Sequence, residues 1–292
     1  HSGEQGSGFM RFNLGSSRSV IAQALDQIEA ASRQNTRVTG VPTGFIDLDN
    51  MLTGLHGSEL ILVAARPAMG KTAFVLNIAH HVAVKKRIPV AIFSLEMSKE
   101  QLVTRMIALD SLVNSQKIQT GQLVDDEWDK IMESTEVIAD APIFVDDNSA
   151  ITVADLRSKC RKLKQNNDLG LIIIDYLQLM NASGMSFGSR QEEVSTISRS
   201  LKGLAKELNI PIIALSQLNR GVESREGIEG KRPQLSDLRE SGAIEQDADL
   251  VLMIHRPERH HILVDEKLQC STKGMGILSV AKHRNGSTGR IY

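Results

Sequence analysis

The residues most suited to chemistry in this sequence form the run Ala65-Arg66-Pro67-Ala68-Met69-Gly70-Lys71-Thr72. Its end, Gly70-Lys71-Thr72, fits the phosphate-binding pattern G-x-x-x-x-G-K-S/T, which lies between a strand and a helix. The first N–H groups of that helix have no partner within the helix, so they can bind phosphate. Lys71 would contribute positive charge to the β- and γ-phosphates, and the Thr72 hydroxyl would ligate Mg²⁺.

The run departs from the strict pattern at one position, because Ala65 stands where the first glycine is expected. Pro67 can fix the curvature of the loop instead. A chance Gly-Lys-Thr at the start of a helix is the alternative, and the apolar run before the loop argues against it. We therefore assign nucleotide binding to eight consecutive residues: Arg66, Pro67, Ala68, Met69, Gly70, Lys71, Thr72 and Ala73.

Three more polar residues follow apolar runs that read as strands. Asp175 could hold Mg²⁺ as a metal ligand together with Thr72, and the alternative is a turn residue. Glu96 could orient and deprotonate the attacking water, and the alternative is an acid at a helix entrance. Gln217 could contact the γ-phosphate and report its presence, and the alternative is an ordinary loop residue.

These residues need a scaffold, and the hydrophobic pattern predicts one in which strands and helices alternate. The predicted strands are Leu60–Ala65, Val90–Leu95, Ile143–Val145, Leu171–Ile174, Ile212–Leu215, Leu250–Ile254 and Ile277–Ala281. The predicted helices are Thr72–Val84, one that opens with a capping box at Ser98, Asp125–Ala139, one from a capping box at Thr152 to about Gln165, and 191–208.

Alternating strands and helices favour an α/β fold with a mostly parallel central sheet and helices on both faces. Ligands of such folds bind outside the carboxyl ends of the strands. We therefore expect the polar residues after the strands to share one edge of the sheet. They are Lys71, Thr72, Glu96, Asp175, Gln217, Lys282 and Arg284.

Composition limits the class of protein. The chain has 292 residues, of which 41% are hydrophobic and 24% are charged, as in ordinary globular proteins. Aromatic residues make up 3%, which argues against a protein that stacks many bases on aromatic rings. The net charge is −1, so any surface for nucleic acid must concentrate positive charge locally. Cys160 and Cys270 are expected to be reduced thiols in the cytoplasm, and no apolar run is long enough to predict a membrane span.

The N-terminal part of the chain has a different character. Residues 1–17 begin with His and are rich in Gly and Ser, so we expect a tag remnant or a disordered lead. Residues 18–39 combine a helix with an apolar stripe at 19–32 and a polar linker. The stripe packs on its own domain or docks on a neighbouring subunit. Residues 40–292 form the predicted catalytic domain.

Several runs of this sequence resemble the motifs of DnaB-type replicative DNA helicases. Besides the phosphate loop, they are Ser94-Leu95-Glu96-Met97-Ser98, Ile174-Asp175-Tyr176-Leu177-Gln178, Ser216-Gln217-Leu218-Asn219-Arg220, Asp237-Leu238-Arg239-Glu240-Ser241-Gly242 and Lys282-His283-Arg284-Asn285-Gly286. The resemblance implies a RecA-like P-loop NTPase fold, with ATP and Mg²⁺ between the subunits of a homohexameric ring around single-stranded DNA. It also implies that this is the C-terminal motor domain, and that the helix at 19–32 docks on the adjacent subunit.

The resemblance assigns further roles. Lys282 and Arg284 would act as catalytic residues in the neighbouring subunit's site, although binding within their own subunit and plain solvation are alternatives. Arg239, Glu240 and Gly242 fall where the family contacts the DNA backbone. The basic stretch around them and the loop Met180–Ser189 are candidate DNA-facing segments, and a solvated surface loop is the alternative. A primase and a helicase loader are implied as partners, at the replisome in the cytoplasm.

The leading functional hypothesis is an ATP-driven motor that unwinds DNA at the replication fork. One alternative is a RecA/RadA-type recombination ATPase that forms filaments and pairs strands. A second alternative, from another class, is a nucleotide-switched scaffold that hydrolyses ATP slowly and binds protein partners. The runs around Arg239 and Arg284 favour the motor.

Overall fold

The computed structural model describes residues 38–181, 187–265 and 269–292, and six separate positions before residue 38. The side chains of residue 228 and of residues 239–243 are outside this description. The predicted lead at 1–17 also lies outside the described residues. Within the predicted helix at 19–32, the described positions are Ala22, Leu25, Asp26, Ile28, Glu29 and Ser32, and all of them are helical.

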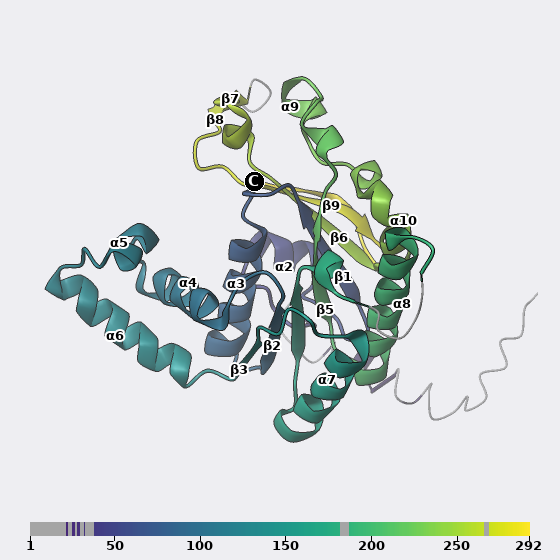
Figure 1. The fold of residues 1–292 in the computed structure, drawn as a ribbon, viewed down its shortest axis with the longest axis horizontal. Helices are drawn as coiled ribbons and strands as arrows, with labels where there is room; N and C mark the ends of the chain where they lie inside the picture. The colour runs from purple at the N-terminus through teal and green to yellow at the C-terminus, as the bar shows by residue number, and fades with distance from the viewer. Residues whose placement is uncertain are drawn as a thin grey trace, which may run out of the picture.

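A central sheet of eight strands dominates the described part of the chain (Figure 1). Its order is β10-β9-β6-β1-β5-β4-β2-β3. The strands are β1 (Leu60–Ala65), β2 (Val90–Ser94), β3 (Ile143–Asp146), β4 (Leu171–Asp175), β5 (Ile212–Gln217), β6 (Leu250–His255), β9 (Ile277–His283) and β10 (Gly289–Ile291). The run from β6 to β3 is parallel, whereas β9 pairs antiparallel with both β6 and β10. The prediction of a mostly parallel sheet is confirmed.

Helices and short turns connect these strands. The helices are α2 (Ile46–Leu52), α3 (Lys71–His80), α4 (Lys99–Ser111), α5 (Ser115–Thr120), α6 (Asp125–Ala139), α7 (Val153–Asn167), α8 (Arg190–Leu208), α9 (Gly227–Gly230) and α10 (Gly242–Asp247). A π-helical turn, His81–Lys85, extends α3, and 3-10 turns are found at Leu177–Leu179, Arg220–Val222, Leu235–Ser241 and Pro257–His260. A two-stranded sheet joins β7 (Val264–Asp265) to β8 (Cys270–Ser271). Capping boxes start α4 at Ser98 and α7 at Thr152, as predicted.

Helices cover both faces of the sheet. Strand β1 is apolar at every position, so it has side chains to bury on each face. Alternate residues of a strand point to opposite faces. Leu60, Leu62 and Ala64 therefore belong to a core shared with α7, α8 and α10. The intervening residues of β1 belong to a second core, shared with α2, α3 and α4. Figure 1 shows these two groups of helices on opposite sides of the sheet. Each fully buried Leu or Ile side chain contributes about 1.5–3 kcal/mol to stability.

The parallel strands bring their carboxyl ends to one edge of the sheet. Ala65 at the end of β1 is level with Gln217 at the end of β5, and Ser94 at the end of β2 is level with Asp175 at the end of β4. The loops that follow these strands therefore converge there, as the sequence predicts. No helix in the described ranges combines the length and the apolar character needed to span a membrane.

Candidate nucleotide-binding site

The phosphate loop is shaped by two residues with left-handed backbone conformations. Ala68 has a φ of 62° and Gly70 a φ of 94°. A Cβ atom on Gly70 would meet nothing within 4 Å, so glycine is required there for its conformation and not for space. The N–H of Phe74 donates to the Gly70 carbonyl at 2.9 Å, and α3 begins at Lys71. The loop therefore leads directly into a helix N-terminus, where N–H groups can bind phosphate.

Lys71 lies where the phosphate loop meets the ends of β4 and β5. Its Nζ donates to the Ser216 carbonyl at 3.2 Å and lies 5.3 Å from the ring centroid of Tyr176. Burial lowers the pKa of Lys71, and the nearby carboxylates of Asp175 and Glu96 oppose that shift. A polyphosphate bound at the loop would place negative charge beside this partly desolvated ammonium group. That charge would stabilise the protonated form of Lys71.

Thr72 and Asp175 provide the oxygen atoms suited to a divalent cation. The Thr72 hydroxyl donates to Asp175 Oδ2 at 2.9 Å. Asp175 is 2% exposed, and its Oδ1 is buried with no hydrogen-bond partner among the described atoms. Burial raises the pKa of the Asp175 carboxyl, although the Thr72 hydroxyl and Lys71 act to lower it. A hydroxyl beside a carboxylate oxygen that lacks a partner fits the oxygen preference of Mg²⁺.

A magnesium ion held here would take its remaining ligands from phosphate and water. Among the described residues, no group of three or more His, Cys, Asp and Glu side chains is arranged to hold a metal ion. Mg²⁺ commonly binds through one or two protein oxygens together with substrate phosphates and water. Thr72 and Asp175 are therefore sufficient as its protein partners.

Glu96 is brought to the same place by the pairing of β2 with β4. The N–H of Leu95 donates to the Asp175 carbonyl at 2.7 Å, which places the next residue, Glu96, near the end of β4. The Glu96 side chain is exposed, and its charge acts on the pKa values of both Lys71 and Asp175. An exposed carboxylate whose charge reaches Lys71 and Asp175 can orient a water molecule at the phosphate loop.

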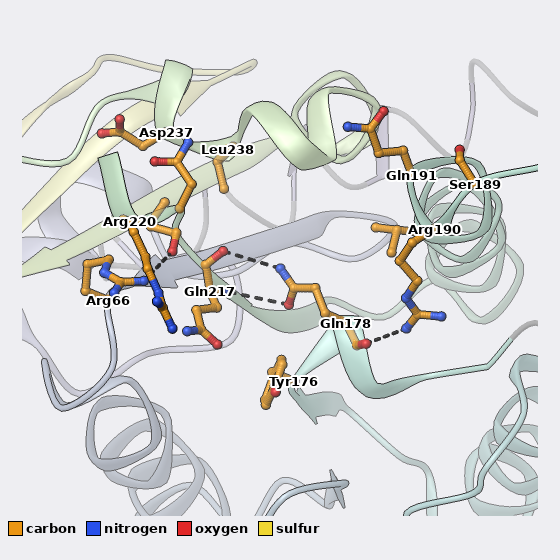
Figure 2. Close-up of a pocket in the computed structure, with 13 residues that line it drawn as sticks. Arg66, Tyr176, Gln178, Ser189, Arg190, Gln191, Gln217, Arg220, Asp237 and Leu238 are labelled. Carbon is orange, nitrogen blue, oxygen red and sulfur yellow. Dashed lines mark hydrogen bonds between the residues drawn. The ribbon is translucent and has the colours of Figure 1, made fainter. Parts of the chain in front are cut away.

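Gln217 completes the edge at the end of β5. Its side chain is exposed, and Figure 2 shows it directed toward Tyr176. Its main chain is held by the Gln178 carboxamide, whose Oε1 accepts from the Gln217 N–H at 3.4 Å. The same carboxamide donates from Nε2 to the Gln217 carbonyl at 3.4 Å and to Ser216 Oγ at 2.8 Å. Gln178 was not predicted as a site residue, although an amide three residues after the strand-end Asp175 was an available signal.

A cavity of about 730 Å³ adjoins this edge, between the ends of β4 and β5 and the first turn of α8 (Figure 2). Arg66 lines it, although its guanidinium is already engaged. Arg66 Nη1 donates to the Leu218 carbonyl at 2.8 Å, and Nε donates to Glu223 Oε1 at 2.8 Å. Within the phosphate loop, Arg66 can therefore offer its main chain to phosphate, while its side chain ties the loop to the segment after β5.

The structure corrects the expected position of Lys282 and Arg284, which do not lie at the edge that carries Lys71. Because β9 is antiparallel to β6, Lys282 is level with Val251, near the amino end of β6. The Arg284 N–H donates to the Asp249 carbonyl at 2.9 Å, and Asp249 in turn bonds to Leu60 at the start of β1. The length of β1 therefore separates the two sites, roughly 16 Å at about 3.3 Å per residue.

Lys282 and Arg284 instead contact the end of α10. Both side chains donate to the Gln246 carbonyl, and Lys282 also donates to the Glu245 carbonyl. Arg284 forms an ion pair with Asp249 at 3.3 Å and keeps 46% of its side chain exposed. Burial and the neighbouring Arg284 lower the pKa of Lys282. Neither residue can serve the phosphate loop of its own chain from this position.

The residues predicted to contact DNA lie on a different segment. Arg239 and Glu240 fall in the 3-10 turn Leu235–Ser241, and Gly242 is the first residue of α10. Of the basic residues near them, Arg225 pairs with Asp237 at 2.6 Å, and Arg232 pairs with Glu229 at 2.8 Å. These two arginines are therefore neutralised within the chain. The second candidate loop, Met180–Ser189, lies partly outside the described residues, at 182–186.

Comparison with known proteins assigns this chain to a family. The family model of the DnaB-like helicase C terminal domain matches residues 40–292. The replicative DNA helicase DnaB of Geobacillus stearothermophilus is 48% identical over 94% of this chain and 58% of its own length. The replicative DNA helicase DnaC of Bacillus subtilis is 47% identical over 94% of this chain and 58% of its own length. The chain thus spans less than two thirds of these relatives.

Two solved structures extend the likeness to three dimensions. The ATPase domain of the protein G40P has a TM-score of 0.84 and 36% identity, over 94% of this chain and 93% of that chain. A DnaB-like replicative helicase, described with its interactions with primase, has a TM-score of 0.82 and 37% identity, over 94% and 63% of the two chains. The expected α/β fold and family resemblance are confirmed: this chain belongs to the DnaB-like helicase C-terminal domain family.

Proposed function

We propose that this chain is the ATP-hydrolysing motor domain of a replicative DNA helicase. One observation carries the proposal: Lys71, Thr72 and Asp175 meet at the carboxyl edge of the sheet, in a chain of this family. Lys71 and the N–H groups of the phosphate loop bind the polyphosphate. Thr72 and Asp175 hold Mg²⁺, which neutralises phosphate charge when bound. This division of labour supports ATP and Mg²⁺ as the cofactors.

Two further residues serve the hydrolysis step. Glu96 orients the attacking water and accepts its proton, because its carboxylate is exposed and close enough for its charge to raise the pKa of Asp175. Gln217 contacts the γ-phosphate and registers its loss. Since Gln217 is followed directly by the segment that leads to Arg239, a change at the phosphate can be passed toward DNA.

Hydrolysis also needs positive charge from a second subunit. Lys282 and Arg284 are separated from their own phosphate loop by the length of β1, yet Arg284 remains half exposed. We assign both to the adjacent subunit's nucleotide, where they stabilise the charge of the transferring phosphoryl group. This arrangement supports a closed ring, a homohexamer by family resemblance, with ATP at each interface.

The predicted helix at 19–32 also supports assembly. Leu25 and Ile28 are described as helical, and they are 54% and 64% exposed. Exposed apolar side chains on a helix favour docking on a neighbouring subunit over packing on their own domain. We therefore assign this helix to the adjacent subunit's surface, as the family resemblance implies.

Single-stranded DNA is the proposed track. Arg239, Glu240 and Gly242 follow the segment that begins at Gln217, and Glu240 would act through its main chain because a carboxylate repels phosphate. Such contacts to the backbone are independent of base sequence. A similar DnaB-like replicative helicase is described with primase, so primase is a proposed partner, as is a helicase loader. The proposed location is the replisome.

Strand displacement on a forked duplex tests the proposal, together with ATP turnover measured with and without single-stranded DNA. The motor predicts ATP-dependent displacement and faster turnover when DNA is present. A recombination ATPase would pair strands and form filaments without unwinding the fork. A nucleotide-switched scaffold would show slow turnover that DNA does not change. Either result would reject the motor, and the family match favours the motor over both.

A further inference from the structure

The sheet is incomplete at one point beside the proposed nucleotide site. β4 and β5 pair from Ile172 with Ile212 to Ile174 with Ala214, where the strand ladder ends. β5 nevertheless continues to Gln217, which still pairs with Ala65 of β1 on its other side. After Asp175 the chain turns into the 3-10 segment Leu177–Leu179. The main chain of Gln217 therefore has no strand residue beside it on the β4 side.

The side chain of Gln178 fills this gap as a main-chain amide would. Its Oε1 accepts from the Gln217 N–H, and its Nε2 donates to the Gln217 carbonyl, both at 3.4 Å. A carboxamide has the donor and the acceptor that one rung of a sheet needs. A shorter hydrogen bond, from Nε2 to Ser216 Oγ at 2.8 Å, holds the carboxamide in place. Figure 2 shows the carboxamide of Gln178 lying alongside the main chain of Gln217.

The same network reaches the phosphate loop and α8. On one side, Lys71 donates to the carbonyl of Ser216, whose hydroxyl bonds to Gln178. On the other side, Arg190 donates to the carbonyls of Gln178 and Met180, the latter at 3.0 Å. Arg190 is the first residue of α8 and pairs with Glu193. Hydrogen bonds thus join the proposed phosphate-binding lysine to the start of α8.

We infer that Gln178 is a positioning residue that fixes the main chain of Gln217 and couples it to α8 through Arg190. The inference rests on the proposed function, because it deepens the role of Gln217. The Gln178 carboxamide contacts Ser216 and Gln217, so it acts on the nucleotide through Gln217. Its effect is to hold Gln217 in one orientation at the edge, so that a change at the γ-phosphate moves the segments after β5 and before α8 together. Without it, Gln217 would be free to turn away from the phosphate.

The test compares Gln178→Ala with the matched control Gln191→Ala. Gln191 lines the same cavity and is exposed, and its side chain has no role in this network. In the assembled protein, Gln178→Ala is expected to lower DNA-stimulated turnover about tenfold and basal turnover by a clearly smaller factor, with the KM for ATP changed less than about twofold. Gln191→Ala is expected to change none of them. Equal losses of basal and stimulated turnover, or no loss, would overturn the inference.

A second readout is independent of activity. Hydrogen exchange of the Gln217 amide, measured without nucleotide or DNA, is expected to be about tenfold faster in Gln178→Ala than in the native protein. Gln178→Glu keeps the acceptor and loses the donor, so it is expected to retain part of the protection while still lowering the stimulated rate. Unchanged exchange in both variants would overturn the inference. If the native protein shows no DNA-stimulated turnover, the proposed function fails, and the exchange result alone decides the role of Gln178.

Discussion

Asp175, a proposed magnesium partner, destabilises the fold by its burial. The carboxyl is almost fully buried, and only one of its two oxygens has a hydrogen-bond partner among the described atoms. A buried polar atom without a partner destabilises a protein by about 1–3 kcal/mol. Positions of this kind are retained where a ligand completes them. The Asp175 Oδ1 atom is therefore a stability penalty that a bound cation would relieve.

Asp175→Asn should change the stability of the fold in a pH-dependent way. Because the pKa of Asp175 is raised in the folded chain, the carboxyl of the unfolded chain loses its proton at lower pH. The penalty is absent below the ordinary pKa of an aspartate and complete above the raised pKa. Asp175→Asn should therefore raise the melting temperature near about pH 8 by about 2 °C or more, and should leave it unchanged near about pH 3. The same variant should lose magnesium-dependent ATP turnover.

Thermal unfolding followed by circular dichroism at several pH values checks this prediction. Asp129→Asn, at an exposed position of α6, is the matched control and should shift the melting temperature little at any pH. A lower melting temperature for Asp175→Asn at neutral pH would show that the carboxylate stabilises the fold. That result would contradict our account of its burial.

Individual site residues differ in how well their places could be predicted from sequence. Lys71 and Thr72 were predictable because the phosphate loop is a local pattern between a strand and a helix. The place of Gln178 depends on where the pairing of β4 with β5 stops, which is a matter of register between distant segments. The placement of Lys282 and Arg284 was wrong for a related reason. Alternation of polar and apolar residues predicts a strand, but not its direction in the sheet.

At the scale of elements, capping boxes predicted where two of the helices begin. The capping box at Ser98 is present in the structure, with the Ser98 side chain accepting from the Gln101 N–H and the Gln101 side chain accepting from the Ser98 N–H. The cap residue Ser98 follows Glu96 by two residues. The cap therefore also fixes the direction in which the chain continues after Glu96. Replacing a serine cap by alanine typically costs about 1 kcal/mol.

Ser98→Ala should therefore lower the melting temperature by about 2–4 °C. Ser195→Ala is the control, because its hydroxyl donates to the Gln191 carbonyl within α8 and caps nothing. That variant should leave the melting temperature nearly unchanged, since alanine is favoured inside a helix. Equal shifts for the two serines would contradict the capping argument. Thermal unfolding measured side by side gives the comparison.

Several short elements of the described structure were not predicted, and helix α2 and strand β10 show the physical reasons. Helix α2 is short, and Ile46 within it is 78% exposed, so it lacks a long apolar stripe. Its start depends on the Asp49 carboxylate, which accepts from the Thr43 N–H and hydroxyl at 2.8 Å. Strand β10 has only three residues, Gly289–Ile291, and is defined by its pairing with β9. Neither element has a period long enough to be recognised from sequence alone.

At the scale of the whole molecule, the separation between Arg284 and the phosphate loop makes a prediction about assembly. Arg284→Ala alone should bind ATP normally and lose most DNA-stimulated turnover, because the missing charge belongs to the neighbouring site. Lys71→Ala alone should lose turnover at its own site. In a mixed oligomer, a Lys71→Ala subunit still presents an intact Arg284 to a neighbour with an intact Lys71.

Mixing the two inactive variants should therefore restore activity. At equal amounts and random assembly, about one interface in four has both intact residues, so turnover should rise toward about a quarter of the native rate if the interfaces act independently. Two mutations that affect the same site from within one chain would give no such recovery. Turnover measured across a series of mixing ratios distinguishes these cases, and a flat response would reject the assignment of Arg284 to the adjacent subunit.

The central claim is that ATP is bound and hydrolysed at the edge of the sheet where Lys71, Thr72 and Asp175 meet. Steady-state ATP turnover by Lys71→Ala tests it most directly, with Lys85→Ala, at an exposed position, as the control. The account predicts that Lys71→Ala loses turnover by about 100-fold or more, while Lys85→Ala keeps the native rate. Native turnover by Lys71→Ala would contradict the account.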